Sequence, residues 1–174
     1  MITASASTGA EPSPVALVRL QGILARVPDP EIPVLSVLDL GVVRHIREHA
    51  DGTIEVGVSP TYSGCPATQV IKADIIDALE RDGFRAVAVD VLSPPWTSDW
   101  ISEEGRRKLL AFGIAPPAEA ATSTRRLLHP DLAIACPHCG STSTMKLSEF
   151  GSTPCKALYR CESCLEPFDY FKCI

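Results

Sequence analysis

The chain has 174 residues, of which 45% are hydrophobic and 21% charged, and its formal net charge is -5, as in ordinary globular proteins of one or two domains. No apolar run approaches the roughly 20 residues of a membrane-spanning helix, and the N-terminus lacks the charged-then-apolar pattern of a secretory signal. We therefore expect a cytoplasmic protein that does not enter a membrane.

The first half of the chain begins with a helix and a hairpin. Ser13-Pro14 is typical of a helix start, and apolar residues then recur at helical spacing, at Leu17, Leu20, Leu24 and Val27. Residues 54–58 alternate between apolar and polar side chains. With residues 42–48, before the turn at Asp51-Gly52, they predict a β-hairpin.

Two acidic segments lie between this helix and the hairpin. The first is Asp29-Pro30-Glu31-Ile32-Pro33. Because prolines stand on both sides of Glu31, we expect a stiff, extended loop that presents its carboxylate. The second is Asp39, before Leu40-Gly41, which can turn the chain, cap it, or point a carboxylate at Cys65; on residue type alone, the turn is favoured.

Cys65 is the most informative single residue of this half. It precedes a helix predicted over residues 66–82, whose buried side carries Val70, Ile71, Ile75, Ala78 and Leu79. A thiol at a helix N-terminus faces unpaired N–H groups and the positive end of the helix dipole, which favour the thiolate. A thiolate is a nucleophile or a soft metal ligand. The alternative is a buried, inert cysteine that packs as a small apolar residue.

A strand and a last helix complete the first domain. Val87, Val89 and Val91 predict the strand, and Ser102 begins a helix that ends at Gly113. The order of helix, hairpin, helix, strand and helix predicts a small α+β domain over residues 14–115.

Between that strand and helix, Trp96 and Trp100 lie in a proline-braced loop. Exposed tryptophans in a rigid loop are good anchors for a partner protein, whereas packing in the core is the alternative.

The C-terminal part carries two C-x-x-C pairs. A Pro/Ala/Thr-rich linker is expected over residues 116–125, followed by a domain over 126–174. Its pairs, Cys136 with Cys139 and Cys161 with Cys164, predict a β zinc ribbon with four thiolates around one structural Zn²⁺. Two redox dithiols or a disulfide framework are weaker alternatives in a reducing cytosol. Without a basic face, the ribbon is not expected to bind nucleic acid.

The remaining cysteines and the histidines leave more than one interpretation open. Cys155 and Cys173 could join Cys65 as soft ligands, pack inside the ribbon, or replace one of the four zinc ligands. The four histidines, His45, His49, His129 and His138, are scattered along the chain. His45 and His49 fall in a predicted strand, where we expect them to face solvent. The chain contains no pair of Glu-x-x-His motifs for a di-iron site and no Gly-rich dinucleotide motif.

The motifs taken together resemble known families. Three of them are similar to the small domain of metal–sulfur cluster assembly factors: Asp29-Pro30-Glu31-Ile32, Asp39-Leu40-Gly41-Val42 and Ser63-Gly64-Cys65-Pro66. The later segments 93–101, 150–157 and 166–173 resemble the PaaD (PaaJ) family of phenylacetate-degradation proteins. That family is encoded with the multicomponent phenylacetyl-CoA 1,2-epoxidase, and the resemblance covers nearly everything from Pro14 to Ile174.

The resemblance implies a non-catalytic maturation factor that delivers an iron–sulfur cluster, or iron, to an oxygenase or reductase component of the epoxidase. It implies that Cys65 is the transient ligand, Asp39 a partner or base, and Glu31 part of the loop that shapes the site. One alternative is a stoichiometric adaptor subunit held by Trp96, Trp100 and the ribbon. Another is a thiol or redox enzyme using Cys65, or Cys155 with Cys173. The oligomeric state, including a homo-oligomer, stays open.

Overall fold

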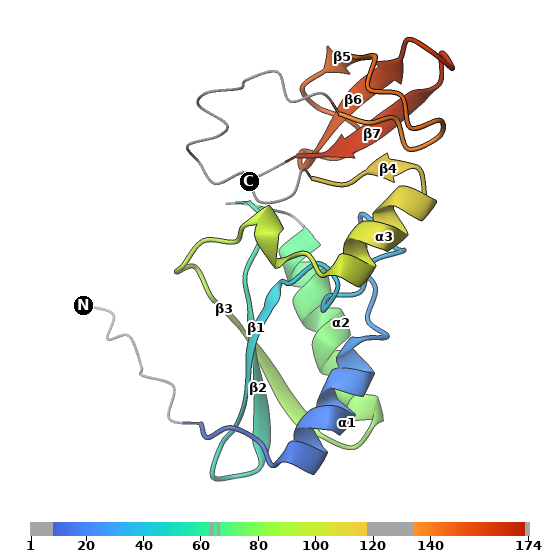
Figure 1. Cartoon of the computed structure of the whole chain (residues 1–174). Coiled ribbons are helices and arrows are strands. Elements are labelled where there is room, and N and C mark those ends of the chain that lie inside the picture. The colour runs from blue at the N-terminus through green and yellow to red at the C-terminus, as the bar shows by residue number, and fades with distance from the viewer. Residues whose placement is uncertain (1–8, 63–64, 66, 118–133, 173–174) are drawn as a thin grey trace, which may run out of the picture.

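The chain folds into an α+β domain with a small β ribbon at one end (Figure 1). A computed structural model describes residues 9–62, 65, 67–117 and 134–172. The elements of the first part are α1 (Pro14–Leu24), β1 (Val43–Glu48), β2 (Thr53–Val58), α2 (Ala67–Arg81), β3 (Arg85–Asp90), the 3-10 helix η1 (Ser98–Trp100) and α3 (Glu103–Ala111). The predicted order of helix, hairpin, helix, strand and helix is confirmed. Within the described ranges, no helix has the length and apolar character needed to span a bilayer.

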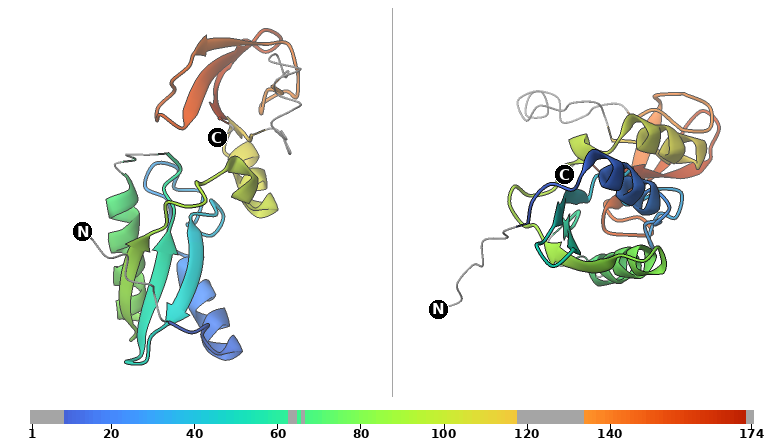
Figure 2. Two further views of the ribbon diagram at one scale, coloured as in Figure 1. Left: turned by 90° about the vertical axis from the view of Figure 1, so that its left-hand side faces the viewer. Right: turned by 90° about the horizontal axis from the view of Figure 1, so that it is seen from below.

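The first sheet has the strand order β1-β2-β3. Strands β1 and β2 form the antiparallel hairpin, whereas β3 runs parallel to β2 and is reached through α2. Figure 2 shows α1 and α2 on the same side of this sheet. Every residue of β2 is buried, and the strand is the central one of the three. The innermost side chains include Leu20, Leu24, Val56, Ile75 and Leu79.

The helix ends follow the sequence signals. The Ser13 hydroxyl accepts a hydrogen bond from the Ala16 N–H at 3.3 Å, and that of Ser102 accepts one from Gly105 at 2.9 Å. Gly113, with φ of +85°, follows α3 in a conformation that favours glycine. One residue was placed wrongly: Val70 is 47% exposed, because the buried stripe of α2 runs through Ala67, Thr68, Ile71, Ile75 and Leu79.

The ribbon sheet joins a short strand at the end of the first domain to three strands from the C-terminal part. Its strands are β5 (Thr144–Ser148), β6 (Lys156–Cys161), β7 (Pro167–Phe171) and β4 (Ile114–Ala115), in the order β4-β7-β6-β5. Strand β4 pairs in parallel with β7, Ile114 opposite Asp169 and Ala115 opposite Tyr170. The last two residues expected in the first domain are therefore an edge strand of the ribbon sheet. Most of the predicted linker, from residue 118 onward, lies outside the described residues.

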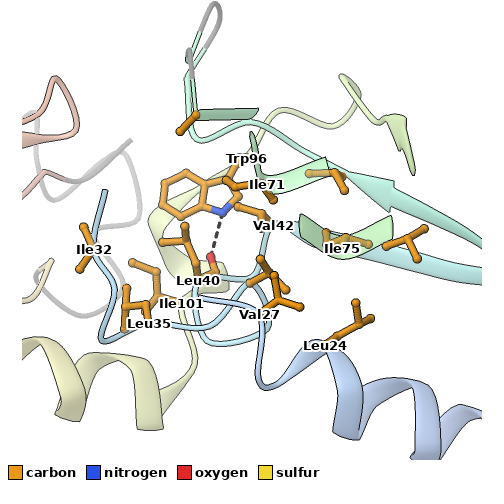
Figure 3. Packing of buried hydrophobic residues seen from close by; sticks show 14 of the residues in the cluster. Leu24, Val27, Ile32, Leu35, Leu40, Val42, Ile71, Ile75, Trp96 and Ile101 are labelled. Atoms are coloured by element: carbon orange, nitrogen blue, oxygen red, sulfur yellow. Dashed lines mark hydrogen bonds between the residues drawn. The ribbon is translucent and has the colours of Figure 1, made fainter. Parts of the chain in front are cut away.

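The ribbon packs directly on the first domain. Phe171 of β7 is 1% exposed and belongs to the core of the first domain, and its ring centroid lies 6.0 Å from that of Trp96. Figure 3 shows the Trp96 ring beside Ile71, Val42 and Leu40. The indole N–H donates to the Leu40 carbonyl at 3.0 Å.

These contacts correct the expectation that Trp96 is an exposed partner anchor. Its side chain is 4% exposed, because an apolar ring with a satisfied N–H gains more in the core than in water. Trp100 is half-buried, with the Arg44 guanidinium 3.3 Å above its ring centroid, so one face of that ring is covered within the chain.

Candidate functional site

A small cavity lies at the junction of the two parts, where the C-terminal end of β2 packs against the ribbon. Its volume is about 10 Å³, close to the room that one water molecule needs. Most of its wall is apolar, but it also holds two carboxylates and two thiols: Asp29, Glu31, Cys65 and Cys155. The structure thus brings Glu31 and Cys65, both predicted site residues, into one place.

Cys65 lies two positions before Ala67, the first residue of α2. Its carbonyl accepts a hydrogen bond from the Thr68 N–H at 3.2 Å, and its own N–H donates to the Tyr62 carbonyl at 3.2 Å. The thiol therefore lies at the N-terminal end of the helix, as predicted, and is half-buried.

Tyr62 lies beside this thiol. Desolvation raises the pKa of Tyr62 to about 12, and the charge and hydrogen bond of Cys65 and the charge of Glu31 contribute further. Sequence reasoning gave Tyr62 no role, because a tyrosine in a loop carries no signal of which acids fold against it.

The loop that follows Pro28 is held by Asp29. The Asp29 carboxylate, in a residue that is 5% exposed, accepts hydrogen bonds from the N–H groups of Glu31 at 2.9 Å and Ile32 at 2.7 Å. The Asp29 N–H in turn donates to the Leu35 carbonyl at 2.8 Å. The loop is therefore compact and bent, not extended as predicted, because a side chain that binds two nearby N–H groups closes a turn.

This compact loop places two acids in a poorly hydrated environment. Burial raises the pKa of Asp29, although its two backbone hydrogen bonds act in the opposite direction. Burial also raises the pKa of Glu31, and the neighbouring charge of Asp29 adds to that rise. A bound cation would stabilise the ionised form of both carboxylates, which their own surroundings disfavour.

Asp39 is placed elsewhere. Its Oδ2 accepts hydrogen bonds from the Ser36 N–H at 2.9 Å and from Lys108 Nζ at 2.7 Å, and it is absent from the cavity wall. Burial by itself would raise the pKa of Asp39, but the hydrogen bonds from Lys108 and Ser36 outweigh burial and lower it. The structure thus gives Asp39 the task of joining the turn at 36–41 to α3, and does not bring it to Cys65.

The four ribbon cysteines form a compact cluster. The sulfur atoms of Cys136, Cys139, Cys161 and Cys164 all lie within 4.8 Å of one another. Two of the separations are 3.7 Å and 3.5 Å, near the roughly 3.8 Å edge of a tetrahedron with Zn–S bonds of about 2.3 Å. Hydrogen bonds lower the pKa of Cys161 to about 6; the largest contribution comes from the Cys164 N–H, which donates to its sulfur at 3.5 Å. The cluster therefore suits a thiophilic dication.

Cys155 is separate from this cluster. It is 3% exposed and lies 3.9 Å from Glu31, measured from Sγ to Oε2. Burial raises the pKa of Cys155 to about 11. Of the other residues considered from the sequence, Cys173 and His129 lie outside the described ranges.

His45 and His49 were expected to face solvent, but both contact a buried carboxylate. Their Nε2 atoms lie 3.0 and 3.2 Å from the two carboxylate oxygens of Glu55, a residue 6% exposed. The His45 ring also lies over Gly57, where an added Cβ would collide with the imidazole. The pair therefore supplies polar partners to a buried carboxylate.

Comparison with known proteins agrees with this architecture. Residues 18–91 match the model of an iron–sulfur cluster assembly protein, and residues 120–172 match the PaaD zinc beta ribbon domain. A protein of Escherichia coli strain K12, named as a subunit of a 1,2-phenylacetyl-CoA epoxidase, is 50% identical over 153 residues, which are 87% of this chain and 90% of that protein.

Two further proteins match about half of the chain. An Fe-S protein maturation auxiliary factor of Porphyromonas gingivalis is 37% identical over 89 residues, 50% of this chain and 84% of that protein. A crystal structure of a DUF59 domain from Bacillus anthracis covers 53% of this chain and 89% of that one, with a TM-score of 0.49 and 23% identity.

The chain thus combines an iron–sulfur cluster assembly domain with a zinc β-ribbon. With this extent of similarity to the Escherichia coli protein, it belongs to the PaaD family, as its motifs predicted.

Proposed function

We propose that this protein is an accessory maturation factor of the multicomponent phenylacetyl-CoA epoxidase in aerobic phenylacetate degradation. It receives iron, or an iron–sulfur cluster, at the Cys65 cavity and passes it to an oxygenase or reductase component of the epoxidase in the cytoplasm. The observation that carries the proposal is the meeting of the Cys65 thiol with the Glu31 and Asp29 carboxylates in one cavity. The names of the relatives, an epoxidase subunit and an Fe-S protein maturation factor, support it.

The chemistry of the donors suits a cargo that must be released. Thiolate binds iron as a soft ligand, and carboxylate as a hard one, so the mixed set accepts ferrous iron without the strength of a four-thiolate site. Cys65 is half-buried and its thiol lies at the end of a helix, where an exchanging ligand can attack. We assign the chain no catalytic reaction of its own.

The ribbon cluster has a different role in this proposal. We propose that Cys136, Cys139, Cys161 and Cys164 hold one structural Zn²⁺, which adds to the small hydrophobic core of the ribbon. The zinc orders β6 and β7, and so holds Phe171 and Cys155 against the first domain. The proposed domains remain those over 14–115 and 126–174, although β4, at the end of the first, pairs with β7 in the ribbon sheet.

The proposal is tested by measuring zinc, iron and acid-labile sulfide per chain after anaerobic reconstitution. Wild type is compared with Cys65→Ala and with Val70→Ala, a control on the exposed side of the same helix. We expect one zinc in all three, and iron, with or without sulfide, only in wild type and the control. Transfer to a metal-depleted epoxidase component should follow the same pattern. Equal iron in wild type and Cys65→Ala, or no iron in any of them, contradicts the proposal.

A further inference from the structure

We infer that Cys155, carried by the ribbon, is the second thiol ligand of the Cys65 cavity, so that the cargo site is assembled from both domains. This inference rests on the proposed function, because it concerns the cargo of the same site. It gives the ribbon a direct part in binding, beyond that of a zinc-stabilised support.

The position of Cys155 carries the inference. It immediately precedes β6, yet its side chain belongs to the buried core of the first domain and lines the same cavity as Cys65. Its sulfur lies 3.0 Å from Thr153 Oγ1 and 3.9 Å from Glu31 Oε2. A purely structural cysteine packs as a small apolar group, whereas this sulfur has a hydroxyl and a carboxylate as neighbours.

The charge around the cavity points to a cation. Two carboxylates, of Asp29 and Glu31, line its wall beside the two thiols. A nearby cation is Lys156, which is 5% exposed, and its Nζ already lies 3.3 Å from Asp169 Oδ2. Buried acidic groups that are not fully compensated gain most from a bound metal ion.

The donor set and the space narrow the class of cargo. Two thiols with a carboxylate suit a thiophilic transition metal, here ferrous iron, either as a single ion or within an iron–sulfur cluster. The volume of about 10 Å³ matches one small ion. A cluster enters only if the two domains separate at this junction.

Binding is also expected to draw the domains together. Within the described ranges, only the zinc-ribbon cysteines have three or more donor atoms within 4.8 Å of one another. Cys65, Cys155 and Glu31 must therefore move closer to hold one ion, and each thiol loses its proton to solvent as it ligates. Because Cys155 moves with the ribbon, loading with a single ion tightens the contact between the two domains.

The test uses Co²⁺ as a spectroscopic probe on the full-length protein whose ribbon is first saturated with Zn²⁺. In the wild type, X-ray absorption at the cobalt edge then counts the sulfur ligands of the Co²⁺ bound at the Cys65 cavity, because the ribbon site is already filled with zinc. We expect two sulfur ligands. Near-ultraviolet sulfur-to-cobalt charge transfer should fall by about half in Cys65→Ser and in Cys155→Ser. The affinity should fall by more than the roughly 10–100-fold that loss of an outer-shell partner costs.

Parallel titrations separate the two forms of iron. Ferrous iron alone and ferrous iron with sulfide are added anaerobically to wild type and Cys155→Ser, with zinc content and thermal midpoint checking that the variant is folded. Weaker loading of Cys155→Ser in either titration supports the inference. One sulfur ligand in the wild type, or unchanged loading of a folded Cys155→Ser, overturns it and leaves the proposed function standing. If the wild type binds no metal beyond zinc, the proposed function itself fails.

Discussion

Replacing Trp96 tests how the two parts of the molecule are joined. The side chain is 4% exposed, packs against Phe171 of the ribbon, and donates to the Leu40 carbonyl. Trp96→Ala removes a whole buried ring, which typically lowers the free energy of unfolding by about 3–5 kcal/mol. Trp96→Phe keeps most of the ring but leaves the Leu40 carbonyl without its donor, which costs about 1–3 kcal/mol.

The assay is urea unfolding at saturating zinc, followed by far-ultraviolet circular dichroism. Trp100→Phe is the control, because Trp100 is half-buried and its ring lies under the Arg44 guanidinium, a contact worth roughly 0.5–1 kcal/mol. We expect losses in the order Trp96→Ala, Trp96→Phe, Trp100→Phe. A Trp96→Ala protein within about 1 kcal/mol of wild type would refute the reasoning, since truncation of a buried Trp typically costs about 3–5 kcal/mol.

The charged groups and the four ribbon cysteines lead to three more predictions. Asp39 has a lowered pKa in the folded protein, so its contribution to stability is present above its usual pKa of 3.8 and is lost as pH falls below it. The stability of Asp39→Asn, followed by circular dichroism during acid titration, should therefore depend less on pH than that of wild type below about pH 4. Glu31 has a raised pKa, and its ionisation disfavours the folded state as pH rises past the usual value of the free carboxyl. With zinc bound and iron absent, Glu31→Gln should therefore equal or exceed the thermal midpoint of wild type at pH 7, while loading less iron. Removing zinc with a chelator should unfold the ribbon and also lower the thermal midpoint of the first domain, because Phe171 belongs to its core; an unchanged midpoint would contradict that coupling.

Local signals in the sequence were sufficient for most of the fold. The cap at Ser13, the turn before β2 and the glycine after α3 each act within a few residues, so propensity and spacing predict them. The cluster of four ribbon cysteines could also be predicted, because the spacing of the two C-x-x-C pairs is by itself typical of a zinc site. Strand β4 was not predicted, because two residues carry no periodicity and its partner is far along the chain.

The residues of the candidate site could be predicted from the sequence only in part, for a related reason. Cys65 and Glu31 could be singled out by their flanking residues, but the sequence does not say which way the ribbon docks. That docking decides whether Cys155 faces the cavity and whether Trp96 is covered by Phe171. Glu55 shows the same limit, because a carboxylate in an alternating strand is expected in water, whereas here it is buried with His45 and His49 among its partners.

The pairing of β4 with β7 has a consequence for limited proteolysis. A cut anywhere between residues 118 and 133 breaks the covalent connection between the two parts. It leaves β4 and Trp96 on the N-terminal fragment and β7 with Phe171 on the C-terminal fragment, so the strand pair and the ring contact still hold the fragments together. The two fragments should therefore co-elute as a nicked complex and separate only under denaturing conditions. Co-expressed halves divided in this segment should likewise reassemble.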